Sequence, residues 1–261
     1  MPNIKLPQIV FVCITVLVIA GCENESSPVM SCEEWGYGQD NGPSEWGRLC
    51  SATCSATRQS PIDIVTSEVE DIDLTEIEFD YSSTLMELFN NGHTIELADE
   101  QATKTNSITI DGNQYDLLQF HFHALSEHTV DGQHSPIEMH LVHSLSSSKL
   151  AVIGVMIEQG ESNPALSAFW SQLPPEKPTD HAEVTVDLEN LLPTNREYYQ
   201  YDGSLTTPNG SNPEASCAEI VNWVVMKDAI TMSEAQITAF QSIFDHNYRP
   251  VQPLNGRVVS R

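Results

Sequence analysis

The sequence predicts a mainly β protein, a single domain built on a large twisted, mostly antiparallel central sheet with short peripheral helices. Two observations support this fold class. Apolar or alternating runs of strand length follow one another at hairpin spacing, and only two segments have the pattern of a helix. With 261 residues, 40% of them hydrophobic, the chain can bury a substantial core.

The first part of the domain, from Cys32 to Cys54, is rich in turn-forming residues and aromatic side chains. We expect an irregular segment, held by Trp35, Tyr37 and Trp46 against a larger part of the molecule. Further along, a turn at Gly92 leads into a strand within Leu88–Leu97. The strands predicted after it are Ser107–Ile110, Tyr115–Ala124, Ile137–Ser144, Leu150–Glu158, Tyr198–Leu205 and Val221–Met226. The run Leu150–Glu158 is almost continuously apolar, so we expect both of its faces to be buried.

Two helices are predicted at the periphery. Asn163–Leu173 has the pattern of a helix, with Ser162 as its N-cap and Pro164 in the first turn. Ser233–Phe244 begins with a serine followed three residues later by a glutamine, which is the spacing of a capping box.

Histidines recur on one face of two predicted strands. Because successive side chains of a strand point to opposite faces, Gln119, His121 and His123 share a face, and the phenylalanines between them share the other. A turn at Asp131-Gly132 separates them from the second strand. There Glu138, His140 and Val142 lie on one face, and Met139, Leu141 and His143 on the opposite one. If the strands are close in one sheet, His140 becomes a third nitrogen beside the first two.

Three neutral imidazoles with an open fourth position form a catalytic zinc site, whereas a structural zinc site is closed by a fourth protein ligand. The alternative interpretation is a pair of half-buried histidines without a metal. Polar residues two positions before a histidine favour the metal site, because Gln119 and Glu138 can each hold a ring proton and fix the tautomer. A buried carboxylate without such a role is unfavourable.

These stretches resemble the metal site of the α-class carbonic anhydrases, and the resemblance extends through most of the chain. The matching stretches are Glu34–Gly38, Asn41–Pro43, Glu45–Gly47, Gln59–Ile64, Asn90–His93, Gln119–His123, Ser126–His128, Glu138–His143, Thr206–Pro208 and Asn247–Asn255. The chain departs from the family after Pro208, where the family's Pro-Pro-Cys is lengthened by Asn209–Ser216 before Cys217. By resemblance alone, Pro61 is a candidate for a cis peptide bond.

The resemblance implies reversible hydration of carbon dioxide to bicarbonate and a proton by a zinc-bound hydroxide. Zn²⁺ lowers the pKa of its bound water to about 7, a figure for which carbonic anhydrase is itself the standard example. Thr206 would accept the hydrogen of the hydroxide and donate its own to an ionised Glu127. His93 would carry the proton to solvent, since an imidazole titrates near neutrality. Thr207 would contact bicarbonate. The apolar pocket for carbon dioxide would be formed by Val142, Val152, Leu205, Val221 and Trp223.

Three other functions remain open. A cupin dioxygenase also uses a His-x-His motif with a nearby Glu, but the glycine pattern of that family is absent. A catalytically silent binding module related to carbonic anhydrases would have lost a ligand, and here all three histidines are present. A periplasmic zinc carrier would need a histidine-rich or acidic loop, which the sequence does not show.

The N-terminus has the pattern of a bacterial lipoprotein signal. Residues 1–21 contain Lys5 and then an apolar run that is too short to span a bilayer, and they lead to Ile-Ala-Gly-Cys, which resembles a lipobox. We therefore expect a signal peptide at 1–21, lipidation of Cys22, a tether at 22–31 and the catalytic domain at 32–261. The alternative is ordinary secretory cleavage. Export and a lipid anchor on a bacterial membrane would place the domain in the periplasm or at the cell surface.

Four cysteines remain in the domain: Cys32, Cys50, Cys54 and Cys217. In an oxidising compartment they allow three pairings, which spacing alone does not separate. The resemblance to bacterial family members favours Cys54 with Cys217, which leaves Cys32 with Cys50. Closing the longer loop would contribute roughly 5 kcal/mol in the loop-entropy estimate, before any discount for strain in the native state.

The formal charge of −26 excludes some partners. It repels nucleic-acid phosphates and argues against a polybasic membrane patch, so the only expected membrane contact is the lipid anchor. The scarcity of Lys and Arg also suggests adaptation to a salty medium, a hypothesis that unchanged stability from low to high salt would contradict. A homodimer is kept as an open alternative for the assembly.

Overall fold

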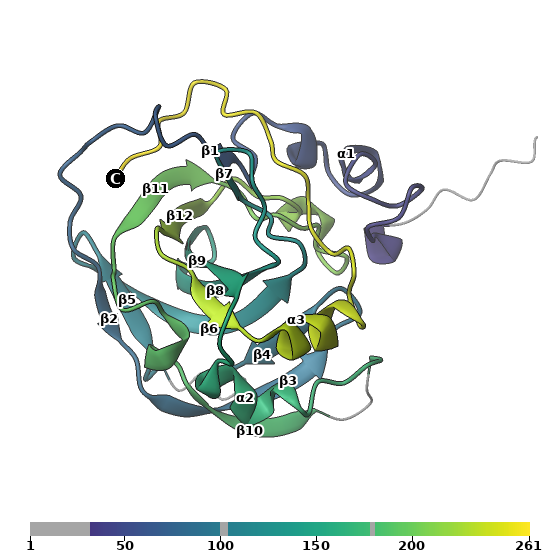
Figure 1. The fold of residues 1–261 in the computed structure, drawn as a ribbon. Coiled ribbons are helices and arrows are strands. Elements are labelled where there is room, and N and C mark those ends of the chain that lie inside the picture. The colour runs from purple at the N-terminus through teal and green to yellow at the C-terminus, as the bar shows by residue number, and fades with distance from the viewer. Residues whose placement is uncertain (1–31, 100–103, 178–180) are drawn as a thin grey trace, which may run out of the picture.

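The structure is a computed structural model that describes residues 32–99, 104–177 and 181–261. The expected signal peptide, the tether and Cys22 lie outside the described residues. Figure 1 shows a large curved sheet with short helices at its periphery. The C-terminal segment, in yellow, passes from α3 (Glu234–Gln241) back across the molecule.

Within the described residues the main sheet has eleven strands. Its path runs β10 (Ala182–Asp187), β3 (Ser83–Asn90), β4 (Ile95–Ala98), β6 (Asn113–His123), β8 (Ile137–Ser146), β9 (Lys149–Gln159), β12 (Val221–Met226) and β11 (Tyr198–Gly203). Off this path, β13 (Ile230–Met232) pairs with β9, and β5 (Ser107–Ile110) pairs with both β6 and β2 (Glu78–Asp80). A separate parallel pair joins β1 (Asp63–Ile64) to β7 (Thr129–Val130).

The predicted fold class is confirmed: the domain is mainly β, and most of its strand pairs are antiparallel. The consecutive strands β6, β8 and β9 are antiparallel neighbours, as their hairpin spacing indicates. The sheet is mixed, because β12 and β13 run parallel to β9. Parallel neighbours need a long crossover connection, and the chain between β9 and β12 is long enough to supply one. The hairpin spacing did not predict this parallel pairing.

The strand predictions hold with small changes in bounds. The ranges of β5 and β12 are those expected, whereas β11 ends at Gly203, two residues before the predicted end. The backbone N–H of the next residue, Ser204, bonds to the hydroxyl of Ser60 rather than to a neighbouring strand. Strands β1, β2, β3, β7, β10 and β13 were not predicted. Four of them, β1, β2, β7 and β13, have only two or three residues and show no period, whereas the eight-residue β3 and the alternating β10 were missed.

The helices are short. They are α1 (Trp46–Leu49), α2 (Pro164–Trp170) and α3, with 3₁₀ turns η1 (Cys32–Glu34), η2 (Ala52–Ser55), η3 (Glu189–Leu191) and η4 (Pro213–Ala215). The predicted N-cap of α2 is wrong: Asn163, not Ser162, accepts the N–H groups of Ala165 and Leu166. Pro164 then takes the first helical position, where its missing N–H is no loss. The capping box of Ser233 and Gln236 at α3 is confirmed.

The core lies on both faces of the central strands. On one face of β6 and β8 the fully buried Phe120, Phe122, Met139 and Leu141 belong to the larger apolar cluster. Strand β9 is buried without interruption from position 151 to 157, which confirms that both of its faces are covered. The helices α2 and α3 add Phe169 and Phe240 to the same cluster.

Both expected disulfides are present, Cys54–Cys217 and Cys32–Cys50. The first is packed with Trp35 and Trp46 in a small separate cluster that Tyr37 covers, so the predicted anchoring of this irregular segment is confirmed. The Ser60–Pro61 peptide bond is cis, as the resemblance suggested.

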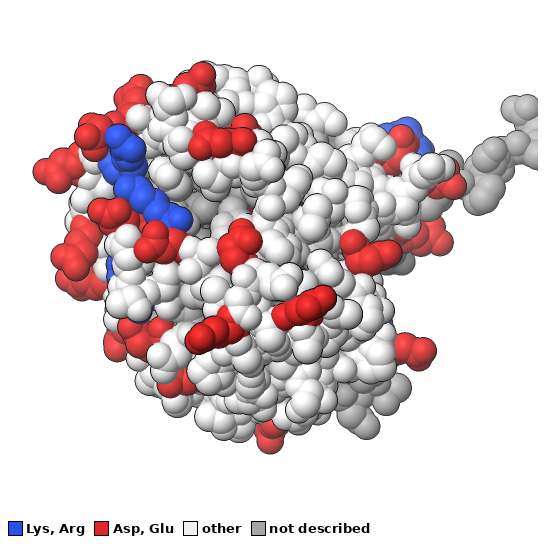
Figure 2. Space-filling view, viewed as in Figure 1, with Lys and Arg blue, Asp and Glu red and all other residues white. Residues whose placement is uncertain are grey.

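The charged surface is dominated by carboxylates. Figure 2 shows Asp and Glu side chains spread over one face, while Lys and Arg gather in a few places. Among the described residues, no helix combines the length and the apolar character needed to cross a membrane.

Candidate metal centre

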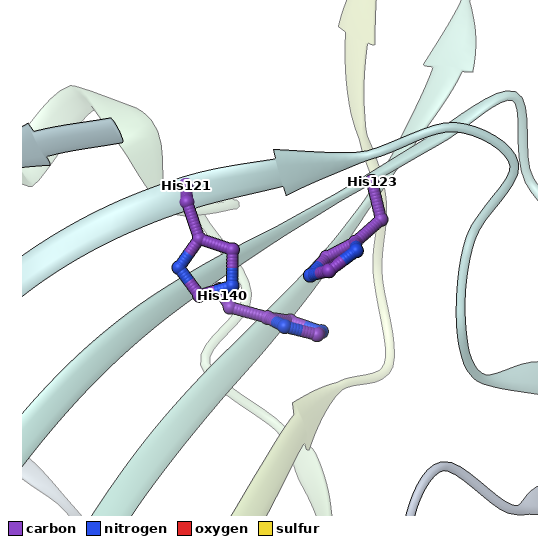
Figure 3. Close-up of side chains that lie close together, drawn as sticks. All are labelled: His121, His123 and His140. Carbon is purple, nitrogen blue, oxygen red and sulfur yellow. The ribbon is translucent and has the colours of Figure 1, made fainter. Parts of the chain in front are cut away.

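Three histidine rings meet above the middle of the sheet. His121 and His123 come from β6 and His140 from β8, and the antiparallel register sets His121 directly opposite His140. One ligand nitrogen from each ring lies within 4.8 Å of the other two. Figure 3 shows the rings converging on one point, two from the same strand and the third from its neighbour.

Each ring is oriented by a hydrogen bond at the nitrogen that faces away from the other rings. Nδ1 of His121 lies 2.8 Å from Oε1 of Gln119, and Nδ1 of His123 lies 2.7 Å from the backbone carbonyl of Asn247. Nε2 of His140 lies 2.9 Å from Oε1 of Glu138. Because carbonyl and carboxylate oxygens only accept, each of these nitrogens carries the proton. The lone pairs are therefore on Nε2 of His121, Nε2 of His123 and Nδ1 of His140.

The environment keeps these rings neutral, which is the form that binds metal. Burial lowers the pKa of all three imidazoles, that of His123 to about 4. Nε2 of His123 is buried and has no hydrogen-bond partner. A buried acceptor left unpaired is unfavourable unless something else occupies it, and a three-nitrogen donor set suits Zn²⁺. The residues present therefore fit a zinc ion with three protein ligands.

Glu138 is the most extensively bonded carboxylate near the rings. Its Oε1 also lies 2.7 Å from Nδ1 of His128, and its Oε2 accepts the backbone N–H groups of Glu127 and His128 at 2.8 Å each. Burial acts to raise the pKa of Glu138, but the two imidazoles and their hydrogen bonds outweigh it and hold that pKa well below its usual value. His128, Glu138 and His140 also lie within metal-binding distance of one another. Because their facing atoms already bond to one another, we interpret them as a hydrogen-bond network.

Glu127 lies beside the inner nitrogens of two of the rings. Its Oε1 accepts the backbone N–H of Arg249 at 2.8 Å. Its Oε2 lies 3.6 Å from Nε2 of His123 and 3.9 Å from Nδ1 of His140. Burial raises the pKa of Glu127 to about 7, against the lowering effects of His140, the Thr206 hydroxyl and the Arg249 amide. Thr206 and Glu127 are thus brought together beside the metal-facing nitrogens.

A pocket of about 510 Å³ opens onto the two histidines of β6. Its lining residues are Trp35, Tyr37, Asn91, His93, Thr94, Glu96, Gln119, His121, His123, Thr207, Pro208, Asn209, Gly210 and Ser211. His93, the predicted proton shuttle, and Thr207, predicted to contact bicarbonate, therefore line the same space as two of the candidate ligands.

His93 is half-buried in the wall of this pocket. Its ring is stacked on Trp35, with 3.7 Å between the centroids and 9° between the planes. Burial, together with the positive charge of Lys177, lowers the pKa of His93 to about 4. The ring is therefore a weaker base here than the near-neutral imidazole expected from its residue type.

The apolar residues predicted to hold carbon dioxide lie together in the second core cluster. Val142, Val152, Val221 and Trp223 are buried members, and Leu205 packs against them. The ring of Trp223 lies 4.9 Å from that of His140, centroid to centroid, so this cluster adjoins the candidate ligands.

Sequence reasoning assigned no role to Asn247, Arg249 or Tyr201. Asn247 orients His123 through its carbonyl, and its side chain bonds to the backbone of His93, Phe122 and Ala124. The Tyr201 hydroxyl lies 2.7 Å from Nε2 of His128. The only signal for these residues was their place in or near matched stretches, since a backbone acceptor leaves no trace in a residue pattern.

The fold and this site define a mixed-sheet protein with a cluster of three histidines that could hold a metal ion, at the side of a pocket. The sequence profile of the eukaryotic-type carbonic anhydrases matches residues 41–261. A carbonic anhydrase of Klebsiella pneumoniae is 42% identical over 231 residues, which cover 86% of this chain and 89% of that protein. The chain therefore belongs to the eukaryotic-type, or α-class, carbonic anhydrase family.

Solved structures agree with this assignment. The α-carbonic anhydrase of Thermovibrio ammonificans, determined with the inhibitor sulfanilamide, matches with a TM-score of 0.79 at 40% identity, covering 87% of this chain and 98% of that one. The α-carbonic anhydrase of Photobacterium profundum matches with a TM-score of 0.78 at 38% identity, covering 87% of this chain and all of that one.

Proposed function

We propose that this chain catalyses the reversible hydration of carbon dioxide to bicarbonate and a proton, with Zn²⁺ held by His121, His123 and His140. The observation that supports this most directly is the orientation of the three rings. Each has its outer nitrogen bonded to an acceptor, and the inner nitrogen of His123 is buried without a partner. When bound, zinc would supply a water whose pKa is about 7, a value known from carbonic anhydrases, and thus a nucleophile at neutral pH.

The residues around the rings would then position the reactants. Glu127, when ionised, accepts the hydroxyl hydrogen of Thr206, which leaves the Thr206 oxygen free to accept a hydrogen bond from the nucleophile. This fixes the direction of the nucleophile's lone pair. The positive charge of a metal favours the ionised carboxylate against the burial that raises its pKa. The apolar cluster with Val142, Val152, Leu205, Val221 and Trp223 would receive the uncharged gas, and Thr207 would contact bicarbonate.

The decisive test of the proposal is zinc stoichiometry together with carbon dioxide hydration, measured by stopped flow on the purified domain. One zinc per chain and rapid hydration are expected. Bound zinc without hydration would favour a catalytically silent binding module. Iron or manganese bound in preference to zinc would favour a cupin-like metal enzyme.

His93 is the proposed proton shuttle, and its environment makes the prediction specific. Proton transfer from a donor of pKa near 7 to a ring of pKa about 4 costs free energy. The rate of transfer through His93 should therefore depend on the buffer. His93→Ala should slow turnover in dilute buffer, and added imidazole should restore it. Turnover that imidazole does not restore would remove this role from His93.

We also propose that the domain is exported and anchored by lipid at Cys22 after removal of residues 1–21. The two disulfides support export, because such bonds persist in oxidising compartments. The expected result is incorporation of labelled palmitate into the full chain and its loss in Cys22→Ala. Equal labelling of both proteins would contradict the anchor, and a released, unlabelled wild type would indicate ordinary secretory cleavage.

A further inference from the structure

The lengthened segment between Pro208 and Cys217 takes part in the pocket. Asn209, Gly210 and Ser211 line it, beside Trp35 and Tyr37 from the start of the domain. We refer to residues 209–216 as the inserted loop and to residues 32–37 as the entry segment. Other lining residues come from β4, β6 and the turn before β4, among them Asn91 and Gln119. We refer to the inserted loop and the entry segment together as the rim of the pocket.

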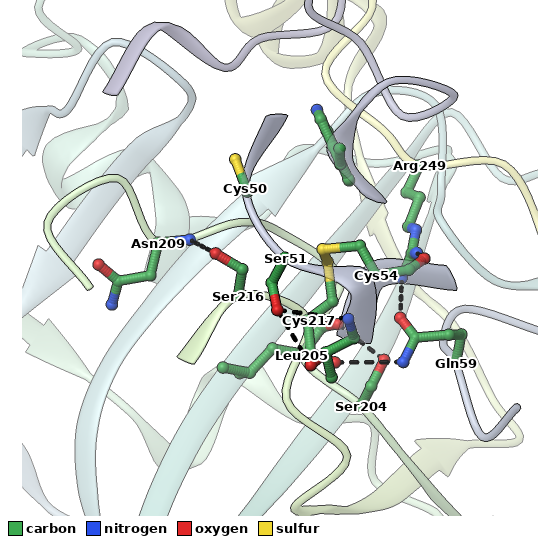
Figure 4. The surroundings of a disulfide bond; sticks show 12 residues. Cys50, Ser51, Cys54, Gln59, Ser204, Leu205, Asn209, Ser216, Cys217 and Arg249 are labelled. Carbon is green, nitrogen blue, oxygen red and sulfur yellow. Dashed lines mark hydrogen bonds between the residues drawn. A yellow bond between two sulfur atoms is a disulfide. The ribbon is translucent and has the colours of Figure 1, made fainter. Parts of the chain in front are cut away.

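The inserted loop is closed on itself. The backbone N–H of Asn209 bonds to the hydroxyl of Ser216 at 3.0 Å, and the N–H of Asn212 bonds to the Asn209 side chain at 2.9 Å. The N–H of Cys217 reaches the carbonyl of Thr207 at 3.1 Å, across the base of the loop. Figure 4 shows the bond between Asn209 and Ser216 beside the Cys54–Cys217 disulfide, which fixes the end of the loop to the body of the domain.

The entry segment packs against the same loop at Cys32, which a disulfide joins to Cys50. Sγ of Cys32 lies 3.8 Å from the carbonyl oxygen of Asn209 and 3.8 Å from the hydroxyl of Ser216. A bonded sulfur carries no proton, so the first distance is a packing contact, and in the second the hydroxyl can donate to sulfur. Cys32 is 5% exposed and is bonded to Cys50, next to the helix that carries the fully buried Trp46. The Cys32–Cys50 bridge thus keeps the entry segment in contact with the inserted loop.

The residues through which the rim lines the pocket are uncharged. The inserted loop contributes an amide, a glycine and a hydroxyl to the lining, and the entry segment contributes two aromatic rings. These side chains act on a ligand by their size rather than by charge. Cys54–Cys217 fixes the end of the inserted loop and Cys32–Cys50 fixes the entry segment beside it, which limits the outward movement that a bulky ligand would require.

We infer that the inserted loop, tied at its end by Cys54–Cys217 and packed against the entry segment that Cys32–Cys50 holds, is a size filter at the pocket: it leaves the route of carbon dioxide and bicarbonate open and restricts ligands with bulky groups. This inference deepens the proposed function and rests on it. Asn209 and Ser211 are its specificity-determining residues, and Cys32 is a positioning residue that acts through its contacts with Asn209 and Ser216.

The test compares a small and a bulky ligand in variants of the full domain loaded with zinc. The first variant lacks residues 210–215, so that Asn209 is joined to Ser216. Carbon dioxide hydration should stay within about twofold of the wild type. The kcat/KM for 4-nitrophenyl pivalate, relative to that for 4-nitrophenyl acetate, should rise at least about tenfold, the lower range for steric discrimination in a pocket. Equal changes for both esters, or no change, would overturn the filter.

A second variant acts in the opposite direction and leaves the chain length intact. Ser211→Trp should lower the pivalate to acetate ratio, whereas Ser147→Trp, on the exposed turn between β8 and β9, should leave it unchanged. If both tryptophans have the same effect, the filter is wrong. The double variant Cys32→Ser, Cys50→Ser should change the ratio in the same direction as the shortened loop. A ratio equal to that of the wild type would show that this disulfide does not hold the rim.

A readout that does not depend on catalysis separates the two proposals. Extraction of zinc by dipicolinate, a ligand much larger than carbon dioxide, should be faster in the shortened-loop variant and slower in Ser211→Trp. If the wild type binds zinc but does not hydrate carbon dioxide, the proposed function fails while the extraction rates still report on the rim. Extraction at one common rate in all variants would overturn the filter alone.

Discussion

The two faces of strands β6 and β8 are both buried, and they are stabilised in opposite ways. One face packs Phe120, Phe122, Met139 and Leu141 in the larger apolar cluster. The other carries His121, His123 and His140, each ring held by a separate acceptor. The apolar face gains free energy in proportion to buried area, whereas the polar face is tolerated only because its outer nitrogens are paired. Stability and chemistry are thus separated by the alternation of side chains along the same two strands.

His123→Ala should produce the largest effect, on the polar face alone. Removing one of three ligands should abolish stoichiometric zinc binding and reduce carbon dioxide hydration at least about 1,000-fold, since a metal supplies several kcal/mol of charge stabilisation. The matched control is His143→Ala, which removes a histidine that is equally buried but lies on the opposite face and bonds to Tyr81. Metal analysis and stopped flow should find zinc and activity in the control. Loss of zinc in both variants would contradict the conclusion that metal binding depends on the polar face alone.

Phe122→Ala should have the converse effect. Its ring is fully buried against Trp170 and Phe240, so its removal leaves a cavity and should lower the free energy of unfolding by about 3–5 kcal/mol. Chemical denaturation measures this change. At a temperature where the variant is folded, zinc stoichiometry should remain one per chain, and a zinc content falling in step with stability would contradict the comparison.

Glu127→Gln tests the electrostatics of the polar face through the pH dependence of stability in the metal-free protein. Burial raises the pKa of Glu127 in the folded state to about 7 from its ordinary value of 4.5, so the folded state binds more protons between these values and this group makes stability fall as pH rises. The wild-type free energy of unfolding, relative to that of the variant, should therefore decrease by about 3 kcal/mol from pH 4.5 to 7. Parallel profiles would contradict the raised pKa.

Glu138→Gln should give the smallest of these effects. The amide cannot accept all the bonds that the carboxylate accepts from His140, His128 and two backbone N–H groups. Zinc affinity should weaken by about 10–100-fold, the usual effect of removing a residue that orients a metal ligand. Competition with a chromophoric chelator measures it. Unchanged affinity would show that His140 is oriented by packing alone.

The sequence predicted those parts of the fold and site that depend on local periodicity. The alternation in Gln119–His123 was enough to place Gln119 and two histidines on one face, and the register then set His140 opposite His121. The N-cap of α2 was missed by one residue, because Ser162 and Asn163 are both good caps and only the backbone decides between them. The parallel pairing of β9 with β12 depends on the route of a long connection, which has no local pattern.

The acceptor of His123 could not be predicted for a related reason. It is the backbone carbonyl of Asn247, 124 positions further along the chain, and every residue type has such a carbonyl. The lowered basicity of His93 likewise depends on Trp35 and Lys177, which come from distant segments. Tertiary partners of this kind appear only in the folded chain.

The position of Asn247 has a consequence for the order of events during biosynthesis. A nascent chain that has emerged as far as β13 already contains all three imidazoles, but it lacks the carbonyl that aims His123 and the amide of Arg249 that bonds to Glu127. With the proposed zinc site, high-affinity metal binding would therefore follow translation and folding of the segment beyond α3.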